Sequence, residues 1–306
     1  MASRFGLFQD LHVACKALAC LGASMAVRRV AGLAAEAGDY SGEDPPLCAV
    51  GTSAAGRGLY VKKPILQREV ILKDVAVVDS VCPQERIQKV FSTRPPEPSR
   101  AQREPIWGMV TNFVYLLQEV PGHLNLSEGA SQASQEGAGM RERRRRLELF
   151  AAFYRPKLQD AKSKLYKLHA AEMHEAMDPT FQQSVASDVV ADLLTVVRLD
   201  AHIVREEGAM NGLGLFFWLH LANHSCCPNA FFHTHTQGGR AKATLYALRP
   251  LASGEEVCIS YVDGQTLLSP VQVRRRIIQN QFGFLCVCSR CREESREAQP
   301  GHPSVS

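Results

Sequence analysis

The chain has 306 residues, 45% of them hydrophobic, so it can bury a sizeable core as one large domain or as one domain with attachments. Its formal net charge of +4 favours acidic partners only mildly and falls well short of the charge density of a dedicated nucleic-acid binder. Four of its ten cysteines lie between Cys258 and Cys291, which suits a local metal site in a reducing compartment better than a dispersed disulfide framework.

The first 46 residues are predicted to form a leader region. Residues 1–35 carry four lysine or arginine side chains but a single acid, Asp10, a composition typical of transit peptides. The apolar stretch from Val13 to Val27 contains Lys16 and is too short to span a bilayer. We therefore favour a leader helix, with import into an organelle as the alternative, and expect no membrane segment in the chain.

The next part of the chain is predicted to be rich in β-structure. Residues 47–78 alternate apolar and polar side chains around a glycine turn, the pattern of short strands in a hairpin. The proline-rich segment 92–100 should run extended over the surface. The apolar segment 105–120 then predicts a buried helix that begins at Pro105.

Helical patterns dominate the middle of the sequence. Residues 127–139 are small, polar and low in complexity, and they predict a flexible loop. Residues 141–177 resume helical spacing, with Pro156 expected to kink or divide them. A further helix follows, for which Ser187 is a plausible cap. We therefore expect a helical insertion over residues of about 75–195.

Strand patterns return after Gly212. They include "RAKATLYALRP" from residue 240 and "EEVCISYV" from residue 255, and a charged helix is expected over residues 269–280. Taken alone, this order of elements indicates an α+β fold, mostly β, with a helical insertion.

A run of arginines stands out in the helical region. The stretch "MRERRRRLELF" contains Arg141 and Arg143 to Arg146. One interpretation is a solvated helix face with charge pairs four residues apart, such as Glu142 with Arg146. The other is a contact for an acidic protein, a nuclear-import receptor or nucleic acid. The sequence does not decide between them.

The cysteines near the end of the chain indicate a metal site. The stretch "FGFLCVCSRC" places Cys286, Cys288 and Cys291 within six residues, and a closed tetrahedral zinc site needs a fourth ligand. The stretch "NHSCCPN" can supply it through Cys226 or Cys227. This arrangement predicts a structural zinc ion that ties the end of the chain to its middle.

Four motifs in order carry a resemblance to a known family. They are "GRGLY" from residue 56, "GLGLFFWLHLANHSCCPN" from residue 212, "GEEVCISYVDG" from residue 254 and "FGFLCVCSRC" from residue 282. In this order they resemble the motifs of SET-domain protein-lysine methyltransferases, and most nearly those of the SET and MYND-containing family, over roughly residues 47–291. The zinc-binding MYND insertion of that family is expected to be missing, because Cys82 is the sole cysteine between Tyr60 and Asn223. We also expect the helical-repeat C-terminal domain to be missing.

The resemblance implies an architecture and its boundaries. Small curved sheets would form a SET domain over residues 47–281, in which the segment around Tyr261 passes beneath the loop that carries Asn223 as a pseudoknot. A zinc-binding post-SET segment would follow over residues 282–291, and residues 292–306 would form a disordered tail.

The resemblance also implies how S-adenosylmethionine is bound. The implied cofactor-binding residues are Ala55, Gly56, Arg57, Asn223, His224, Tyr261 and Phe284. Glycine lets the backbone approach a ligand closely, and an asparagine amide can both donate and accept, which suits the amino-acid end of the cofactor. From the residues alone, Asn223 and His224 would also fit a hydrogen-bonded turn before Pro228. Asp200 lies near the position of a cofactor-contacting asparagine in the family, and a carboxylate can only accept hydrogen bonds.

The catalytic residue implied by the resemblance is Tyr261, which would orient the lysine amine and the methyl group. The amine, with a pKa of about 10.4 in water, must lose its proton before it attacks. A narrow apolar channel beside the positive sulfonium favours the neutral amine. From the residues alone, the alternative is that Tyr261 is a core aromatic of a strand. Phe282 would line the substrate channel where relatives often carry tyrosine, which leaves the extent of methylation open.

The resemblance selects Cys226 over Cys227 as the fourth zinc ligand, because Cys226 ends the Asn-His-Ser-Cys run that matches the family's ligand position. One structural zinc ion would then be held by Cys226, Cys286, Cys288 and Cys291.

Two functions remain open on these grounds. The first is an S-adenosylmethionine-dependent protein-lysine N-methyltransferase that acts on a histone or a non-histone protein. The alternative is a zinc-stapled binding or adaptor module that keeps the SET fold and has lost turnover. We expect a monomer in the cytoplasm or nucleus whose partner is a protein that presents a lysine.

Overall fold

The computed structural model describes residues 47–53, 56–97, 104–119, 138–153, 161–206 and 209–297. Several sequence predictions lie outside these residues. They concern the leader region, Ala55, the flexible loop up to residue 137, the effect of Pro156 and the tail beyond residue 297. Residues 138 and 139, which the sequence analysis placed in that loop, are instead the first residues of a helix. None of the described helices has both the length and the apolar character needed to cross a membrane.

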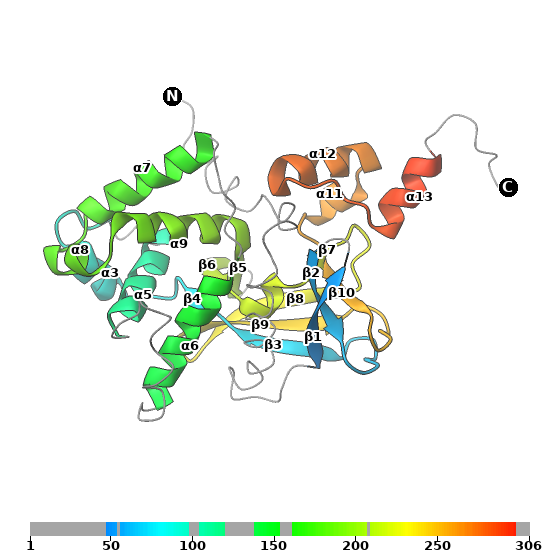
Figure 1. Ribbon diagram of the computed structural model, residues 1–306, viewed down its shortest axis with the longest axis horizontal. Coiled ribbons are helices and arrows are strands. Elements are labelled where there is room, and N and C mark those ends of the chain that lie inside the picture. Colours follow the sequence, from blue (N-terminus) through cyan, green and yellow to red (C-terminus); the bar gives the residue numbers. More distant parts are fainter. Residues whose placement is uncertain are drawn as a thin grey trace.

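A four-stranded sheet carries the segments predicted to bind the cofactor (Figure 1). Its order is β1 (Cys48–Ser53), β2 (Gly56–Val61), β10 (Glu256–Ile259) and β7 (Asn223–His224). Strand β10 is antiparallel to β2 and parallel to β7. This order places the Asn-His pair beside the strand that leads directly to Tyr261.

Two three-stranded sheets complete the β-structure. One has the order β3 (Val70–Val75), β9 (Arg240–Ala247) and β8 (Ala230–Gln237). The other has the order β4 (Val78–Asp79), β6 (Ala209–Leu215) and β5 (Ala201–Glu206). The prediction of small sheets combined with helices is therefore confirmed.

Helices occupy the chain between β4 and β5, where the insertion was expected. They are α3 (Gln84–Val90), α5 (Ile106–Gln118), α6 (Ala138–Ala152), α7 (Ala161–Glu175), α8 (Pro179–Ser184) and α9 (Ser187–Asp200). Pro105 precedes α5, as the sequence predicts, and most of this apolar helix is buried. Ser187 is not the cap of α9: Ala186 holds that position, and Ser187 is the first helical residue.

The close packing of α5 depends on a glycine. A Cβ atom on Gly108 would lie 2.4 Å from the backbone oxygen of Ser80, so any larger residue would push the helix away from the chain that follows β4. Asn112 on the same helix donates from Nδ2 to the backbone oxygens of Asp79 and Val81. The helical insertion is thus tied to the sheet of β4, β5 and β6.

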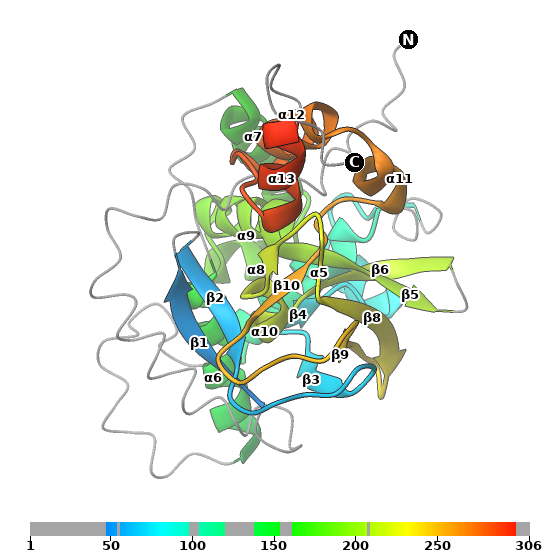
Figure 2. The same ribbon diagram turned by 90° about the vertical axis from the view of Figure 1, so that its right-hand side faces the viewer.

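The C-terminal helices form a separate layer. The helices α11 (Gly264–Leu268), α12 (Val271–Phe282) and α13 (Ser289–Glu297) lie above the four-stranded sheet (Figures 1 and 2) and, in Figure 1, to the right of α5, α7, α8 and α9. Residues 292–297 are helical in α13, so the tail that the sequence analysis began at residue 292 does not begin there.

Two apolar clusters meet at one residue. The main core runs through the sheets and the insertion helices, while a smaller cluster joins Cys226, Cys286 and Cys291 to apolar residues of α12. Tyr261 packs against both clusters. The predicted catalytic residue therefore lies at the junction between the sheets and the C-terminal layer.

Candidate active site and cysteine cluster

Asn223 is fixed by two hydrogen bonds from its side-chain amide. Its Nδ2 donates to the backbone oxygen of Arg57 at 2.8 Å and to Oε1 of Glu256 at 2.7 Å. Both amide hydrogens are therefore used, which leaves Oδ1 as the group that can accept a hydrogen bond from a ligand. A Cβ atom on Gly58 would lie 2.5 Å from Oε1 of Glu256, so the glycine is needed for this contact.

Glu256 was not identified from the sequence. It belongs to the "GEEV" stretch, but nothing in a short strand indicates which side chain on another strand it meets. The pairing of β10 with both β2 and β7 brings Glu256 to Asn223.

His224 links three parts of the site. Its Nδ1 accepts a hydrogen bond of 3.0 Å from the backbone N–H of Tyr261. Because Nδ1 must then carry a lone pair, the proton of the neutral ring lies on Nε2. Nε2 is 3.4 Å from Sγ of Cys226 and can donate to it. His224 thus connects the start of the Tyr261 segment to the cysteines.

The hydroxyl of Tyr261 points back to the loop before β7. It donates to the backbone oxygen of Ala222 at 2.8 Å, and the ring lies 5.1 Å from that of Phe282 between centroids. Burial, and then the negative charge of Asp200, raise the pKa of the Tyr261 hydroxyl well above its ordinary value. The Tyr261 hydroxyl therefore keeps its proton, which it donates to Ala222.

A cavity of about 60 Å³ adjoins this hydroxyl. Tyr261, Phe282, Asp200, His220 and Phe232 are among the residues that line it. Aromatic rings and the buried, hydrogen-bonded pair of Asp200 and His220 therefore line the space next to the predicted catalytic residue.

Asp200 is the unusual residue of this cavity. It is buried at the end of α9, and its Oδ1 lies 2.6 Å from Nδ1 of His220, a residue of α10 (Phe217–His220). Its Oδ2 is buried and has no hydrogen-bond partner among the described residues. Burial lowers the pKa of the Arg57 guanidinium, and the charge of Asp200 partly offsets this effect. The sequence placed Asp200 near the cofactor but gave no sign of its partner His220.

Phe284 completes the aromatic group. Its ring lies 6.1 Å from His224 and 6.2 Å from Phe282 between centroids. The structure brings together the predicted cofactor and channel residues Arg57, Asn223, His224, Tyr261, Phe282 and Phe284. Gly56 lies in β2 with a φ of 100°, a backbone conformation that favours glycine.

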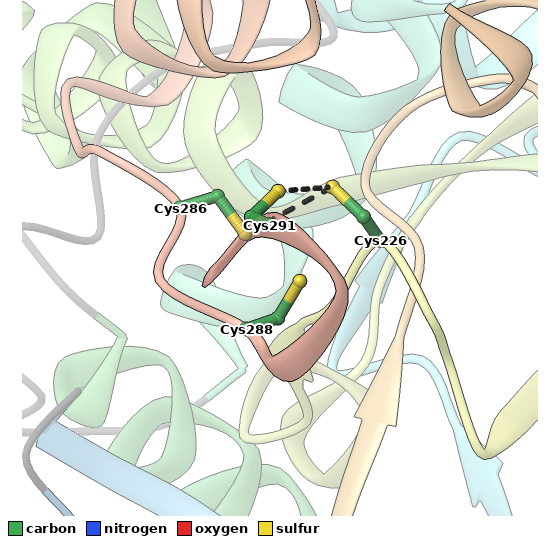
Figure 3. A group of neighbouring side chains, drawn as sticks. All are labelled: Cys226, Cys286, Cys288 and Cys291. Atoms are coloured by element: carbon green, nitrogen blue, oxygen red, sulfur yellow. Dashed lines mark hydrogen bonds between the residues drawn. The ribbon is translucent and has the colours of Figure 1, made fainter. Parts of the chain in front are cut away.

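The four cysteines predicted to meet lie together (Figure 3). The sulfur atoms of Cys226, Cys286, Cys288 and Cys291 all lie within 4.8 Å of one another, and three of these residues are buried. Cys227 is exposed and is not part of the group. Four thiolates at this separation are the ligand set of a closed tetrahedral zinc site.

Arg274 supports the cluster from inside the protein. It is fully buried; its Nη1 donates to the backbone oxygen of Ser269, and its Nη2 donates to Sγ of Cys291 at 3.5 Å and to Glu294 at 2.8 Å. The sequence predicted a charged helix in this region. It did not indicate which of its three consecutive arginines would be buried.

Two further arginines hold the backbone of the cysteine segments. Arg275 donates to the carbonyl oxygens of Cys286 and Cys291, and Arg290 donates to that of Cys226. Four thiolates around one divalent ion leave a net charge of −2, and the three guanidinium groups place positive charge beside it.

Residues 56–262 match the family model described as SET domain, and this match covers most of the chain. The chain therefore belongs to the SET-domain family.

Curated relatives share shorter parts of the sequence. Histone-lysine N-methyltransferase ATXR2 of Arabidopsis thaliana is 40% identical over 73 residues, which are 24% of this chain and 15% of that protein. Human protein-lysine N-trimethyltransferase SMYD5 is 35% identical over 86 residues, which are 28% of this chain and 20% of that protein. The chain thus spans a small part of the length of these relatives.

A solved structure resembles the chain over a longer stretch. It is the crystal structure of the SET domain of LSMT bound to lysine and AdoHcy, and the superposition covers 87% of this chain and 58% of that one. The sequence identity is 13% and the TM-score is 0.43.

We expect Arg274→Met to lower the free energy of unfolding by about 2–3 kcal/mol. This is less than the roughly 3–5 kcal/mol expected for breaking a fully buried ion pair, because the side chain of Glu294 is 30% exposed. Chemical denaturation of the purified protein measures the change. Arg276→Met is the matched control, since Arg276 is exposed on the same helix, and it should change the value by less than about 0.5 kcal/mol. Equal effects of the two substitutions would contradict the role of Arg274.

Proposed function

We propose that this chain is an S-adenosylmethionine-dependent protein-lysine N-methyltransferase. The observation that carries the proposal is the convergence of Asn223, His224 and Tyr261 through the parallel pairing of β7 with β10. Membership of the SET-domain family and the names of the curated relatives support it. The alternative stays a binding module that keeps the fold without turnover.

The cofactor would be held between β2, β7 and the segment that carries Phe284. The free Oδ1 of Asn223 is suited to accept from the ammonium group of the cofactor, because its Nδ2 is already engaged. Phe284 would provide an apolar surface for the adenine. Ala55 and Gly56 stay predicted contacts of the glycine turn.

Once bound, the cofactor supplies the sulfonium methyl group. The chain's own contribution is a small cavity beside a neutral Tyr261, with Phe282 and Phe232 on its walls. Such walls disfavour a charged lysine ammonium and hence favour the neutral amine that can attack. The Tyr261 hydroxyl would position the amine by accepting a hydrogen bond from one of its N–H groups, because the hydroxyl donates its own proton to the backbone oxygen of Ala222.

The cysteine cluster is proposed to hold one zinc ion with a structural role. Four cysteines fill a tetrahedral site and leave no position for water, so the ion would take no part in the chemistry. It would instead tie α13 and Phe284 to the loop that carries His224.

The substrate is proposed to be a protein lysine, on a histone or a non-histone protein. The relatives' names include both histone-lysine and protein-lysine enzymes, so the two kinds of substrate stay open. A monomeric state and a place in the cytoplasm or nucleus stay predictions.

Methyl transfer from radiolabelled S-adenosylmethionine to histones and peptide arrays tests the function. We expect Tyr261→Phe to lose transfer by about tenfold or more, since one hydroxyl that acts in the transition state is removed, while cofactor affinity by calorimetry changes little. Unchanged turnover would reject Tyr261 as the catalytic group. Cofactor binding by the unmodified protein without any transfer would favour the binding module instead.

Glu256→Ala should weaken S-adenosylmethionine binding by about 1–2 kcal/mol, or about 5- to 30-fold, because the Asn223 amide loses one of its two fixed partners. Calorimetry measures the affinity. Glu255→Ala is the control, since Glu255 is the preceding residue and bonds to Arg249 and Asn229 rather than to Asn223. Equal affinities of the two variants would show that Glu256 does not position Asn223.

Elemental analysis of the purified protein should find one zinc ion per chain, and Cys226→Ser should lose it while Cys227→Ser keeps it. The reason is that Cys226 lies in the four-cysteine group and Cys227 is exposed outside it. Loss of the metal from Cys227→Ser alone would overturn the ligand assignment. A zinc-free unmodified protein would overturn the site itself.

A further inference from the structure

The arginine run of α6 does not form a uniformly solvated face. Arg143 and Arg146 line a cavity of about 290 Å³ between α3, α5, α6, β4 and the turn that joins β8 to β9. This cavity shares no lining residue with the one beside Tyr261. Helix α6 stands next to β4, away from α12 and α13 (Figure 1). The space is therefore a second cavity, distinct from the proposed methyl-transfer site.

The lining of this second cavity is rich in charge, with a positive excess. Four guanidinium groups come from three helices or strands, and three carboxylates face them. The charged lining residues are Arg86, Arg143, Arg146, Arg240, Asp79, Glu119 and Glu142. The arginines exceed the acids by one, so the lining as a whole attracts an anion.

Most of these charges already have partners within the lining. Arg240 pairs with Asp79 at 3.2 Å and with Glu142 at 3.7 Å, and Arg143 pairs with Glu119 at 2.6 Å. Arg146 donates from Nε to the backbone oxygen of Val77. These contacts hold three of the four arginines in fixed positions around the space.

Arg86 differs from the other three arginines because an aromatic ring holds its guanidinium in place. Its Cζ lies 4.5 Å from the centroid of the Tyr115 ring, and no carboxylate of the described part of the chain pairs with it. A guanidinium that stacks on a ring by its face keeps the N–H groups at its edge available. That edge matches the two oxygens of a carboxylate or a phosphate.

The other lining residues suggest the rest of the ligand. Tyr115, Leu116 and Val81 add apolar surface next to the arginines. A volume of about 290 Å³ lies at the lower end of small-molecule sites. We propose that this cavity binds a small organic oxyanion, a phosphate or carboxylate carried on an apolar body, with Arg86 as its main anchor.

Calorimetric titration with phenyl phosphate and with benzoate, at constant ionic strength, tests the proposal and separates the two kinds of oxyanion. At least one of them should bind saturably with a dissociation constant of about 1 mM or tighter. Arg86→Ala should weaken this binding by about tenfold or more, because a charge-assisted pair is removed. Arg86→Lys should restore only part of the affinity, since lysine keeps the charge but cannot bind two oxygens of the ligand with a planar pair of N–H groups.

Arg276→Ala is the matched control, because Arg276 is an exposed arginine of α12 and lines neither cavity. It should bind both probes as the unmodified protein does, and the melting temperatures of all variants should agree. Saturable binding by neither probe would overturn the proposal. So would an Arg86→Ala variant that binds as tightly as the Arg276→Ala control. Methyl transfer does not enter this test, so its result is independent of the proposed function.

Discussion

The parallel pairing of β7 with β10 is the constraint on which the rest of the site depends. Cys258 and Ile259 pair with Asn223 and His224, two residues of a loop that is more than thirty positions earlier in the chain. This short ladder brings Nδ1 of His224 to the backbone N–H of Tyr261. The hydrogen bond between them fixes the start of the Tyr261 segment. A shift by one residue would turn each side chain to the opposite face and separate them.

The cysteine cluster extends this constraint to the C-terminal layer. Cys226 follows His224 by two residues, Cys286 and Cys288 lie between α12 and α13, and Cys291 lies in the first turn of α13. Bringing four thiolates together in the interior is unfavourable unless a cation or hydrogen-bond donors compensate their negative charge. The buried guanidinium of Arg274 supplies such a donor to Sγ of Cys291, and Arg275 fixes the backbone oxygen of Cys286. The layer that carries Phe284 is therefore held by charge as well as by apolar packing.

The sequence predicted what depends on local pattern and missed what depends on pairing between distant strands or helices. Ordered motifs located Asn223, Tyr261 and the cysteines, because each lies in a short stretch of unusual composition. Glu256 and His220 lie in the same motifs but were missed, since each finds its partner only after the sheets and helices assemble. Helical spacing also did not predict which of the three successive arginines is buried. Arg274 is covered by α13, which begins fifteen residues later in the chain.

Asp200 changes the electrostatics of the cavity next to Tyr261. A carboxylate attracts a lysine ammonium into the cavity, but it also favours the protonated amine, so its two effects on methyl transfer oppose each other. His220 engages one oxygen, and the other has no partner among the described residues. Arg57 is near enough for its pKa to respond to the charge of Asp200. In the proposed enzyme, the positive charge of Arg57 would offset part of the negative charge of Asp200. Arg57 would then reduce the preference of this carboxylate for a protonated lysine, in addition to its predicted place in the glycine turn.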